Sequence, residues 1–218
     1  MAQGIQDLLL KKAISLVPRE ERSKGLFSII FLVQKVTGGF RLVLDLKRLN
    51  RFITKVRFKM ETLQRIIPLM SPNHYMCTLD LQDAYYHILI FKVHRIYLRF
   101  SVQGLQYQYN VFPFGLKTAP RVFTKVVAPL VASLHLQGIR LYPYLDDWLV
   151  HSPSASQLLL ELQRVCLVVQ EHGFLLYIKK CNLSPSLDVT FIRARFRTDL
   201  NKGFLPDSRG ACLCLSRH

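Results

Sequence analysis

The chain has 218 residues, of which half are apolar and a fifth are charged, so its composition is that of a folded domain and excludes a disordered segment. Lysine and arginine number 30 against 14 aspartate and glutamate residues, and this net charge of +16 favours a polyanionic partner such as nucleic acid. No apolar run reaches the roughly 18 residues that span a bilayer, the start lacks a secretion signal, and the five cysteines are scattered, so we expect a cytoplasmic or nuclear protein with no membrane partner.

The first part of the chain predicts a short helix followed by a basic hairpin. Residues 5–16 have the apolar spacing of a short amphipathic helix. Residues 27–36 and 40–46 are rich in Val, Ile and Leu, as strands are, and a Thr-Gly-Gly turn separates them. The first 60 residues carry 13 basic and 4 acidic side chains, so we expect this hairpin to have a basic rim.

The rest of the chain predicts short strands interleaved with helices. This alternation of local strands and helices indicates an α+β fold rather than a parallel βαβ array. The predicted helices are 60–70, 118–136 and 154–172, and the predicted strands are 75–81, 88–93, 96–102, 141–145, 148–151, 174–178 and 189–196.

Acidic residues are scarce, and three of them lie in apolar strand surroundings. Asp80 ends an apolar run, and Asp146 and Asp147 stand side by side in a Tyr-Leu-Asp-Asp-Trp segment. Carboxylates in such surroundings are unfavourable unless they bind a cation, and adjacent aspartates repel each other. A pair of divalent cations satisfies both, and oxygen ligands suit Mg²⁺. Asp-Asp is also a common turn dipeptide, so a tight hairpin without chemistry remains the alternative.

Six characteristic segments follow one another between about residues 5 and 205. They are Phe-Leu-Val-Gln-Lys (31–35), Gly-Gly-Phe-Arg-Leu-Val-Leu-Asp (38–45), Leu-Asp-Leu-Gln-Asp-Ala-Tyr (79–85), Phe-Pro-Phe-Gly-Leu (112–116), Tyr-Leu-Asp-Asp (144–147) and Gly-Phe to Lys-Lys (173–180). In this order and spacing they resemble the successive blocks of retroelement reverse transcriptases. The forms at 112–116 and 144–148 are most similar to those of DIRS-type retrotransposons.

The resemblance implies the fingers and palm of a right-hand polymerase, with an antiparallel palm sheet, helices packed on one face, and a thumb that is largely absent. Nothing after about residue 205 resembles a thumb or a ribonuclease H domain. The implied boundaries are fingers at 1–74 and 88–118, with the basic hairpin at 27–46; palm at 75–87 and 119–205, with the catalytic hairpin at 141–151; and an unassigned tail at 206–218.

The implied activity is that of an RNA-directed DNA polymerase core, which adds deoxynucleoside triphosphates to the 3′-hydroxyl of a primer on an RNA or DNA template. Asp80, Asp146 and Asp147, with the backbone carbonyl of Leu81, would hold two Mg²⁺ ions, for which Mn²⁺ can substitute. Lys180 would protonate the leaving pyrophosphate, and a surface lysine is its alternative. The oligomeric state stays open.

The resemblance also implies a nucleotide-binding pocket that includes a gate against the ribose 2′-hydroxyl. Taken without the family, the same residues read as a solvated basic hairpin, a core aromatic and a packed loop. The implied residues are Lys35 and Arg41 for the triphosphate, Asp83 and Ala84 through their backbones, Tyr85 as the gate, and Gly115 beside the nascent base pair.

Two departures from the family pattern support alternatives to an active polymerase. Tyr177 stands where the family usually has Asn, and Phe-Ile-Arg at 191–193 stands where the primer-gripping segment usually reads Phe-Leu-Gly. An arginine in place of glycine can strain a turn. The alternatives are therefore an inactive or truncated relic that only binds nucleic acid, and another two-metal enzyme such as a nuclease or cyclase.

Overall fold

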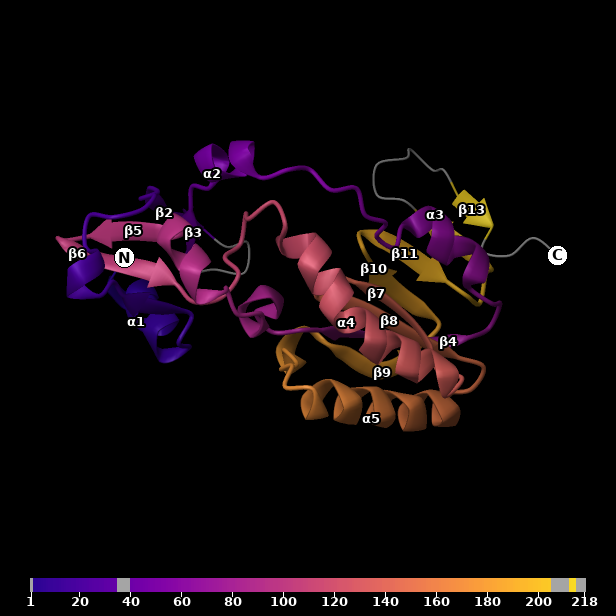
Figure 1. Cartoon of the computed structure of the whole chain (residues 1–218). Helices are drawn as coiled ribbons and strands as arrows, with labels where there is room; N and C mark the ends of the chain where they lie inside the picture. Colours follow the sequence, from indigo (N-terminus) through magenta and orange to yellow (C-terminus); the bar gives the residue numbers. More distant parts are fainter. Residues whose placement is uncertain (1, 35–39, 205–211, 215–218) are drawn as a thin grey trace. The chain divides into compact units, whose positions relative to one another are not determined.

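A computed structural model describes residues 2–34, 40–204 and 212–214 of the chain (Figure 1). The chain divides into two compact units. Unit 1 comprises Met1–Arg57 and Tyr85–Phe123, and unit 2 comprises Phe58–Ala84 and Thr124–His218. In the part of the chain that the structure describes, no helix has both the length and the apolar character needed to cross a bilayer.

Unit 1 contains a three-stranded antiparallel sheet in the order β1-β6-β5 and a separate hairpin of β2 and β3. The elements, in chain order, are α1 (Ala2–Leu10), β1 (Ile14–Leu16), η1 (Arg19–Glu21), β2 (Ile30–Gln34), β3 (Phe40–Leu44), α2 (Lys47–Phe52), η3 (Ala84–His87, whose first residue belongs to unit 2), η4 (Lys92–Tyr97), β5 (Arg99–Val102), β6 (Leu105–Tyr109) and the start of α4 (Ala119–Leu136).

One apolar core holds unit 1 together, because α1, the strands and the start of α4 all contribute buried side chains to it. The hairpin of β2 and β3 confirms the predicted strand pair, while its turn lies outside the described residues. The buried members include Ile5, Leu8, Leu42, Leu44, Phe100, Tyr109 and Ala119.

Two predictions for unit 1 were wrong. The helix predicted at 5–16 ends at Leu10, because Lys12 takes a positive φ of 53° and Ile14 then pairs with Tyr109 in the sheet. The strand pair predicted at 88–93 and 96–102 does not form. Residues Lys92–Tyr97 make a 3₁₀ helix instead, and the second strand pairs with Leu105–Tyr109.

Unit 2 contains two four-stranded sheets, in the orders β7-β8-β4-β9 and β10-β11-β12-β13. Its helix α5 packs against β4, β8 and β9 (Figure 1). Besides most of α4, its elements are α3 (Leu63–Ile66), η2 (Ile67–Leu69), β4 (Tyr75–Asp80), β7 (Arg140–Tyr144), β8 (Asp147–Ser152), α5 (Ala155–Glu171), η5 (Ile178–Lys180), β9 (Asn182–Ser186), β10 (Asp188–Phe191), β11 (Ala194–Arg197), β12 (Lys202–Phe204) and β13 (Cys212–Cys214).

Strands β4 and β8 lie at the centre of the first sheet of unit 2, and their sequences show why. Trp148–Ser152 is buried throughout, and Met76, Cys77 and Leu79 are inaccessible to solvent. Strands in which consecutive residues are buried are covered on both faces. The sheet therefore fixes the ends of β4 and β8, where the aspartates lie.

The helix predicted at 154–172 and its end at Gly173 are confirmed. The Oγ atom of Ser154 accepts a hydrogen bond from the backbone N–H of Gln157 (3.2 Å), which satisfies a free donor at the helix start. Gly173 has φ 79°, the left-handed conformation that commonly follows a helix.

The strand predicted at 189–196 is in fact a hairpin. Residues Ile192 and Arg193 both have positive φ, 50° and 65°, and they turn the chain so that Phe191 pairs with Ala194. A single strand was predicted because neither turn residue is of a type that usually marks a turn.

Candidate active site

The three aspartates meet at one end of the first sheet of unit 2. Strands β4 and β8 are antiparallel neighbours, and in their register Asp80 lies directly opposite Asp147. The backbone N–H of Leu81 donates a hydrogen bond to the carbonyl of Asp146 (2.8 Å), so the strand end is tied to the hairpin tip. Residues 67 positions apart along the chain are thus adjacent in space.

All three aspartates line the same cavity of about 420 Å³, which lies within unit 2. The turn between β7 and β8 is tight: Leu145 has a φ of 53°, and its carbonyl accepts a hydrogen bond from the indole N–H of Trp148 (2.9 Å). Trp148 is fully buried, so it anchors the turn to the core. The Asp-Asp pair is therefore a turn, as the simpler reading held, and also part of a cavity.

The carboxylates are held in surroundings that disfavour their charge. Burial raises the pKa of Asp80, the nearby Lys180 opposes that rise, and Asp146 adds to it. Partial desolvation, followed by repulsion from Asp146 and Asp80, raises the pKa of Asp147 to about 6, although its side chain as a whole reaches solvent. A cation bound among these groups would relieve the repulsion.

Lys180 is the basic side chain that contacts this cluster. Its Nζ atom lies 3.3 Å from Oδ2 of Asp80 and 5.3 Å from the ring centroid of Tyr177. The Lys180 side chain is about half exposed, at 49%, so it can exchange this partner for another at little cost. The structure therefore brings Lys180 to the aspartates.

The segment after Gly173 braces the end of β4, mostly through its backbone. The N–H of Tyr177 donates to the carbonyl of Asp80 (2.8 Å), and the N–H of Gln82 donates to the carbonyl of Leu175 (2.7 Å). The strand predicted at 174–178 was wrong: Leu176 makes an isolated bridge to Leu81, and a 3₁₀ helix follows. The bracing involves no Tyr177 side-chain bond to the strand, so the residue type at 177 is not what holds it.

Cys181 is a site residue that the sequence analysis missed. Its Sγ atom accepts a hydrogen bond from the backbone N–H of Asp80 (3.3 Å) and lies 3.4 Å from the carbonyl of Tyr177. Burial raises the pKa of this thiol, so it stays protonated and acts as a neutral brace. A cysteine with no partner spacing gives no signal of this role in sequence.

The cavity suits a divalent cation by the chemistry of its donors, since carboxylate and carbonyl oxygens are the ligands of Mg²⁺. Within the described ranges, however, no three His, Cys, Asp or Glu side chains form a group arranged to hold a metal ion. The aspartates thus share a cavity without forming a ready-made set of ligands, and Oδ2 of Asp80 is engaged by Lys180.

Among the residues that the structure describes, Arg41, Tyr85 and Gly115 are the expected nucleotide-binding residues of unit 1. The guanidinium of Arg41 lies over the ring of Phe114, 4.6 Å from its centroid. The ring of Tyr85 packs against those of Phe114 (5.3 Å) and Phe123 (5.8 Å) and against the unit 1 core. Tyr85 therefore packs as a core aromatic of unit 1, as expected without the family resemblance.

Gly115 lies in a loop that Asn50 fixes, a contact that the sequence analysis did not predict. The Nδ2 group of Asn50 donates to the carbonyl of Gly115 (2.8 Å), and its Oδ1 accepts from the N–H of Lys117 (2.9 Å). Gly115 has φ 90°, and a Cβ there would meet no atom within 4 Å. The glycine is therefore required by its backbone conformation, and the space beside it is open.

The other nucleotide-binding candidates lie in unit 2 or outside the described residues. Asp83 and Ala84 follow the braced end of β4 in unit 2; Asp83 has a positive φ of 50°, and Ala84 is buried. Lys35 lies outside the described residues.

Comparison with known proteins identifies the family. The family described as "Reverse transcriptase (RNA-dependent DNA polymerase)" matches residues 33–192. This chain belongs to the reverse transcriptase family. The match includes β3, all three aspartates, Lys180 and the segment that braces β4.

The related reverse transcriptases are parts of much longer polyproteins. The chain is 28% identical over 170 residues to the Retrovirus-related Pol polyprotein from transposon 412 of Drosophila melanogaster, covering 78% of the chain and 13% of that protein. It is 25% identical over 204 residues to the Transposon Tf2-3 polyprotein of Schizosaccharomyces pombe, covering 94% and 15%. It is therefore a reverse transcriptase domain of the retroelement kind that spans about a seventh of these relatives.

Solved structures confirm the fold. The foamy viral protease-reverse transcriptase in complex with double-stranded DNA has a TM-score of 0.77 and 25% identity, covering 90% of this chain and 34% of that one. The same enzyme in complex with an RNA/DNA hybrid has a TM-score of 0.77 and 24% identity, covering 94% and 26%. The α+β fold of fingers and palm predicted from sequence is therefore confirmed.

Proposed function

We propose that this chain is the catalytic core of an RNA-directed DNA polymerase, which adds deoxynucleotides to a primer 3′-hydroxyl on an RNA or DNA template. The observation that carries the proposal is the register of β4 and β8, because it sets Asp80 opposite Asp147 and beside Asp146 in one cavity. The net charge of +16 supports a nucleic-acid partner.

We propose that residues 1–74 and 88–118 form the fingers and that residues 75–87 and 119–205 form the palm. The basic hairpin of β2 and β3 lies in unit 1, and the sheet that carries the aspartates lies in unit 2. The motifs at 112–116 and 144–148 support a place among DIRS-type elements. Localisation in the cytoplasm or nucleus follows as part of the same proposal.

The aspartates and the carbonyl of Leu81 would hold two Mg²⁺ ions, with Mn²⁺ as a substitute. The raised pKa values of Asp80 and Asp147 support this, because these carboxylates are partly desolvated and lie beside further carboxylates, and a bound cation would stabilise their charged forms. When bound, the cations would neutralise charge on the reacting phosphates. The protein's own contribution is to fix the carboxylates on a rigid strand pair.

In the transfer, the primer hydroxyl attacks the α-phosphate and pyrophosphate leaves. The side chain of Lys180, which pairs with Asp80 in this structure, would donate a proton to the leaving pyrophosphate. Around the nucleotide, Lys35 and Arg41 would bind the triphosphate, Tyr85 would exclude a ribose 2′-hydroxyl, and Asp83, Ala84 and Gly115 would line the pocket.

Incorporation on a primed RNA template, with Mg²⁺ or Mn²⁺, tests the proposal. Asp146→Asn should lower incorporation about a hundredfold or more, because one metal ligand and its charge are lost, while template binding stays near that of the wild type. Asp199→Asn, which removes an exposed carboxylate elsewhere in unit 2, is the control and should incorporate normally.

Other outcomes would support competing functions. Salt-dependent binding of primed template without any incorporation by the wild type would identify the inactive relic. Release of nucleotides from the template, without extension, would identify a nuclease. Equal incorporation by wild type and Asp146→Asn would remove the aspartates from the chemistry.

A further inference from the structure

The end of β4 that carries Asp80 is paired with a neighbouring strand on one side only. Strand β8 follows β4 as far as Asp80, which lies opposite Asp147. The pairing with β9, in contrast, ends at Thr78, opposite the first residue of β9. Asp80 therefore lies beyond the start of β9. A buried N–H is costly to leave without a partner, so that of Asp80 requires an acceptor from outside the sheet.

The thiol of Cys181 is that acceptor. Its Sγ atom lies 3.3 Å from the backbone nitrogen of Asp80 and 3.8 Å from the carbonyl oxygen of the same residue. It also lies 3.4 Å from the carbonyl oxygen of Tyr177. A thiol is both a weak acceptor and a weak donor, so this one group can accept from the N–H and donate to a carbonyl. The carbonyl of Asp80 accepts the N–H of Tyr177 (2.8 Å), so both backbone groups of the aspartate are bonded.

The backbone around Cys181 fixes the position of the sulfur. The N–H of Cys181 donates to the carbonyls of Ile178 (3.1 Å) and Tyr177 (3.3 Å), and these bonds end the 3₁₀ helix η5. Of the two bonds to the backbone of Asp80, only the one from the thiol depends on the type of residue, because nearly every residue provides a backbone N–H. The side chain at 181 is therefore the part of this contact that a substitution can remove.

Cys181 directly follows Lys180, and the two residues hold the same aspartate. The thiol bonds the backbone of Asp80, while the Nζ atom of Lys180 lies 3.3 Å from its carboxylate oxygen Oδ2. Asp80 is only 8% exposed, so a shift of its backbone would move a largely buried carboxylate relative to Asp147 on the neighbouring strand. All four residues belong to unit 2. The thiol is thus placed to set where the carboxylate of Asp80 lies.

We propose that Cys181 is a positioning residue for the phosphoryl transfer and that it acts through Asp80. The inference rests on the proposed polymerase function. The thiol holds the end of β4 so that the carboxylate of Asp80 keeps its place beside Asp146 and Asp147. A small displacement of a group at the reacting centre lowers the rate of the chemical step, and it leaves contacts made elsewhere with the substrates unchanged.

Two substitutions separate the hydrogen bond of the thiol from the packing of the sulfur. Cys181→Ser keeps a group that accepts and donates, whereas Cys181→Val fills the space without a polar atom. On a primed template, Cys181→Val should lower kcat about tenfold, with KM for the nucleotide and affinity for primed template within about twofold of wild type. Cys181→Ser should keep kcat within about threefold. A normal kcat in Cys181→Val would overturn the proposal, as would a serine variant no faster than the valine variant.

Cys166→Val is the matched control, because it makes the same replacement at another partly buried thiol of unit 2, in α5. Its kcat should stay within about twofold of wild type. A loss equal to that of Cys181→Val would show that the rate follows the general packing of unit 2, and would contradict a role that acts through Asp80.

Hydrogen exchange at the amide of Asp80 measures the bond without any need for activity. This amide should exchange about tenfold faster in Cys181→Val than in wild type, and at nearly the wild-type rate in Cys181→Ser. Unchanged exchange in Cys181→Val would overturn the assigned contact. A wild-type chain that never incorporates nucleotides would refute the polymerase proposal and the positioning role with it. Wild-type incorporation with an unchanged kcat in Cys181→Val would refute the positioning role alone.

Discussion

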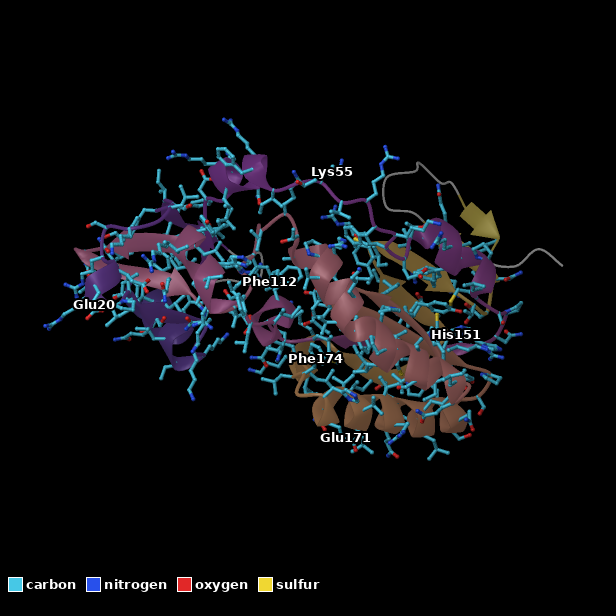
Figure 2. All side chains as sticks on the ribbon, in the orientation of Figure 1. Glu20, Lys55, Phe112, His151, Glu171 and Phe174 are labelled. Carbon is cyan, nitrogen blue, oxygen red and sulfur yellow. The ribbon has the colours of Figure 1, made fainter. Side chains whose placement is uncertain are left out.

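The contact between His74 and His151, a residue of β8, predicts how the stability of unit 2 changes in acid. His151, which belongs to β8 and is labelled in Figure 2, is fully buried. Its Nδ1 lies 3.0 Å from Nδ1 of His74, and its Nε2 lies 3.2 Å from the hydroxyl of Tyr142. Burial, then His74 and Arg140, lower the pKa of His151 to about 3. Burial and Arg140 also lower the pKa of His74, whereas the carboxylate of Glu161 raises it.

The lowered pKa of His151 gives the size and the sign of the change in the free energy of unfolding with pH. The folded state keeps His151 neutral down to about pH 3, whereas in the unfolded chain the ring takes up a proton below about pH 6.5, its ordinary pKa. The stabilisation is therefore complete above pH 6.5 and is lost as the pH falls. At pH 5 the free energy of unfolding is about 2 kcal/mol lower than at neutral pH because of His151 alone.

Urea unfolding at pH 7 and pH 5 measures the loss. Trp148, the single tryptophan of the chain, lies buried in β8 and reports on unit 2 through its fluorescence. His151→Gln removes the titrating ring, so the pH 7 to pH 5 change in the free energy of unfolding should differ from that of wild type by about 2 kcal/mol. The comparison cancels the contributions of the aspartates. His135→Gln, at an exposed position of unit 2, is the control, and its change in the free energy of unfolding between pH 7 and pH 5 should equal that of wild type. Equal changes in wild type and His151→Gln would refute the reasoning.

Three further outcomes are expected. Mg²⁺ at tenfold over its dissociation constant should stabilise the folded chain by about 1.4 kcal/mol in thermal unfolding, and Asp147→Asn should abolish the shift; an unchanged shift would exclude this site. Tyr85→Ala should reduce discrimination against ribonucleotides in incorporation assays, whereas Tyr86→Ala, whose ring also packs against Phe114, should not; equal discrimination in both variants would remove the gate. Asn50→Ala should lower the free energy of unfolding by about 1–2 kcal/mol, through loss of the two side-chain hydrogen bonds to the loop at 115–117, and a denaturant titration that shows no loss would contradict this.

Local signals in the sequence were sufficient for helix α5 and for the central strands of unit 2, but not for the end of the helix predicted at 5–16. Helix α5 begins after a capping serine and is followed by a glycine, and β4 and β8 contain the short apolar runs 75–77 and 148–150, so each could be located. Lys92–Tyr97 was mistaken for part of a strand pair because its apolar residues imitate one. Only tertiary pairing of β5 with β6 reveals the error.

The candidate site was predictable as a set of residues but not as an assembly. The aspartates stood out because carboxylates are rare in apolar runs. Cys181 and Asn50 gave no signal, since their roles depend on backbone groups more than 60 residues away in the chain. The position of Arg193 beside the aspartates could not be predicted, because the strands that line the cavity are distant from one another in the chain.

The bracing of β4 has a consequence for how such a sequence can change over time. The bonds that join Tyr177 to Asp80 and Gln82 to Leu175 are made by amide and carbonyl groups that every residue except proline provides in full. Substitutions at 175 and 177 can therefore accumulate in successive copies of an element while the acidic centre keeps its shape. Divergence in this stretch is a poor guide to whether a copy still works.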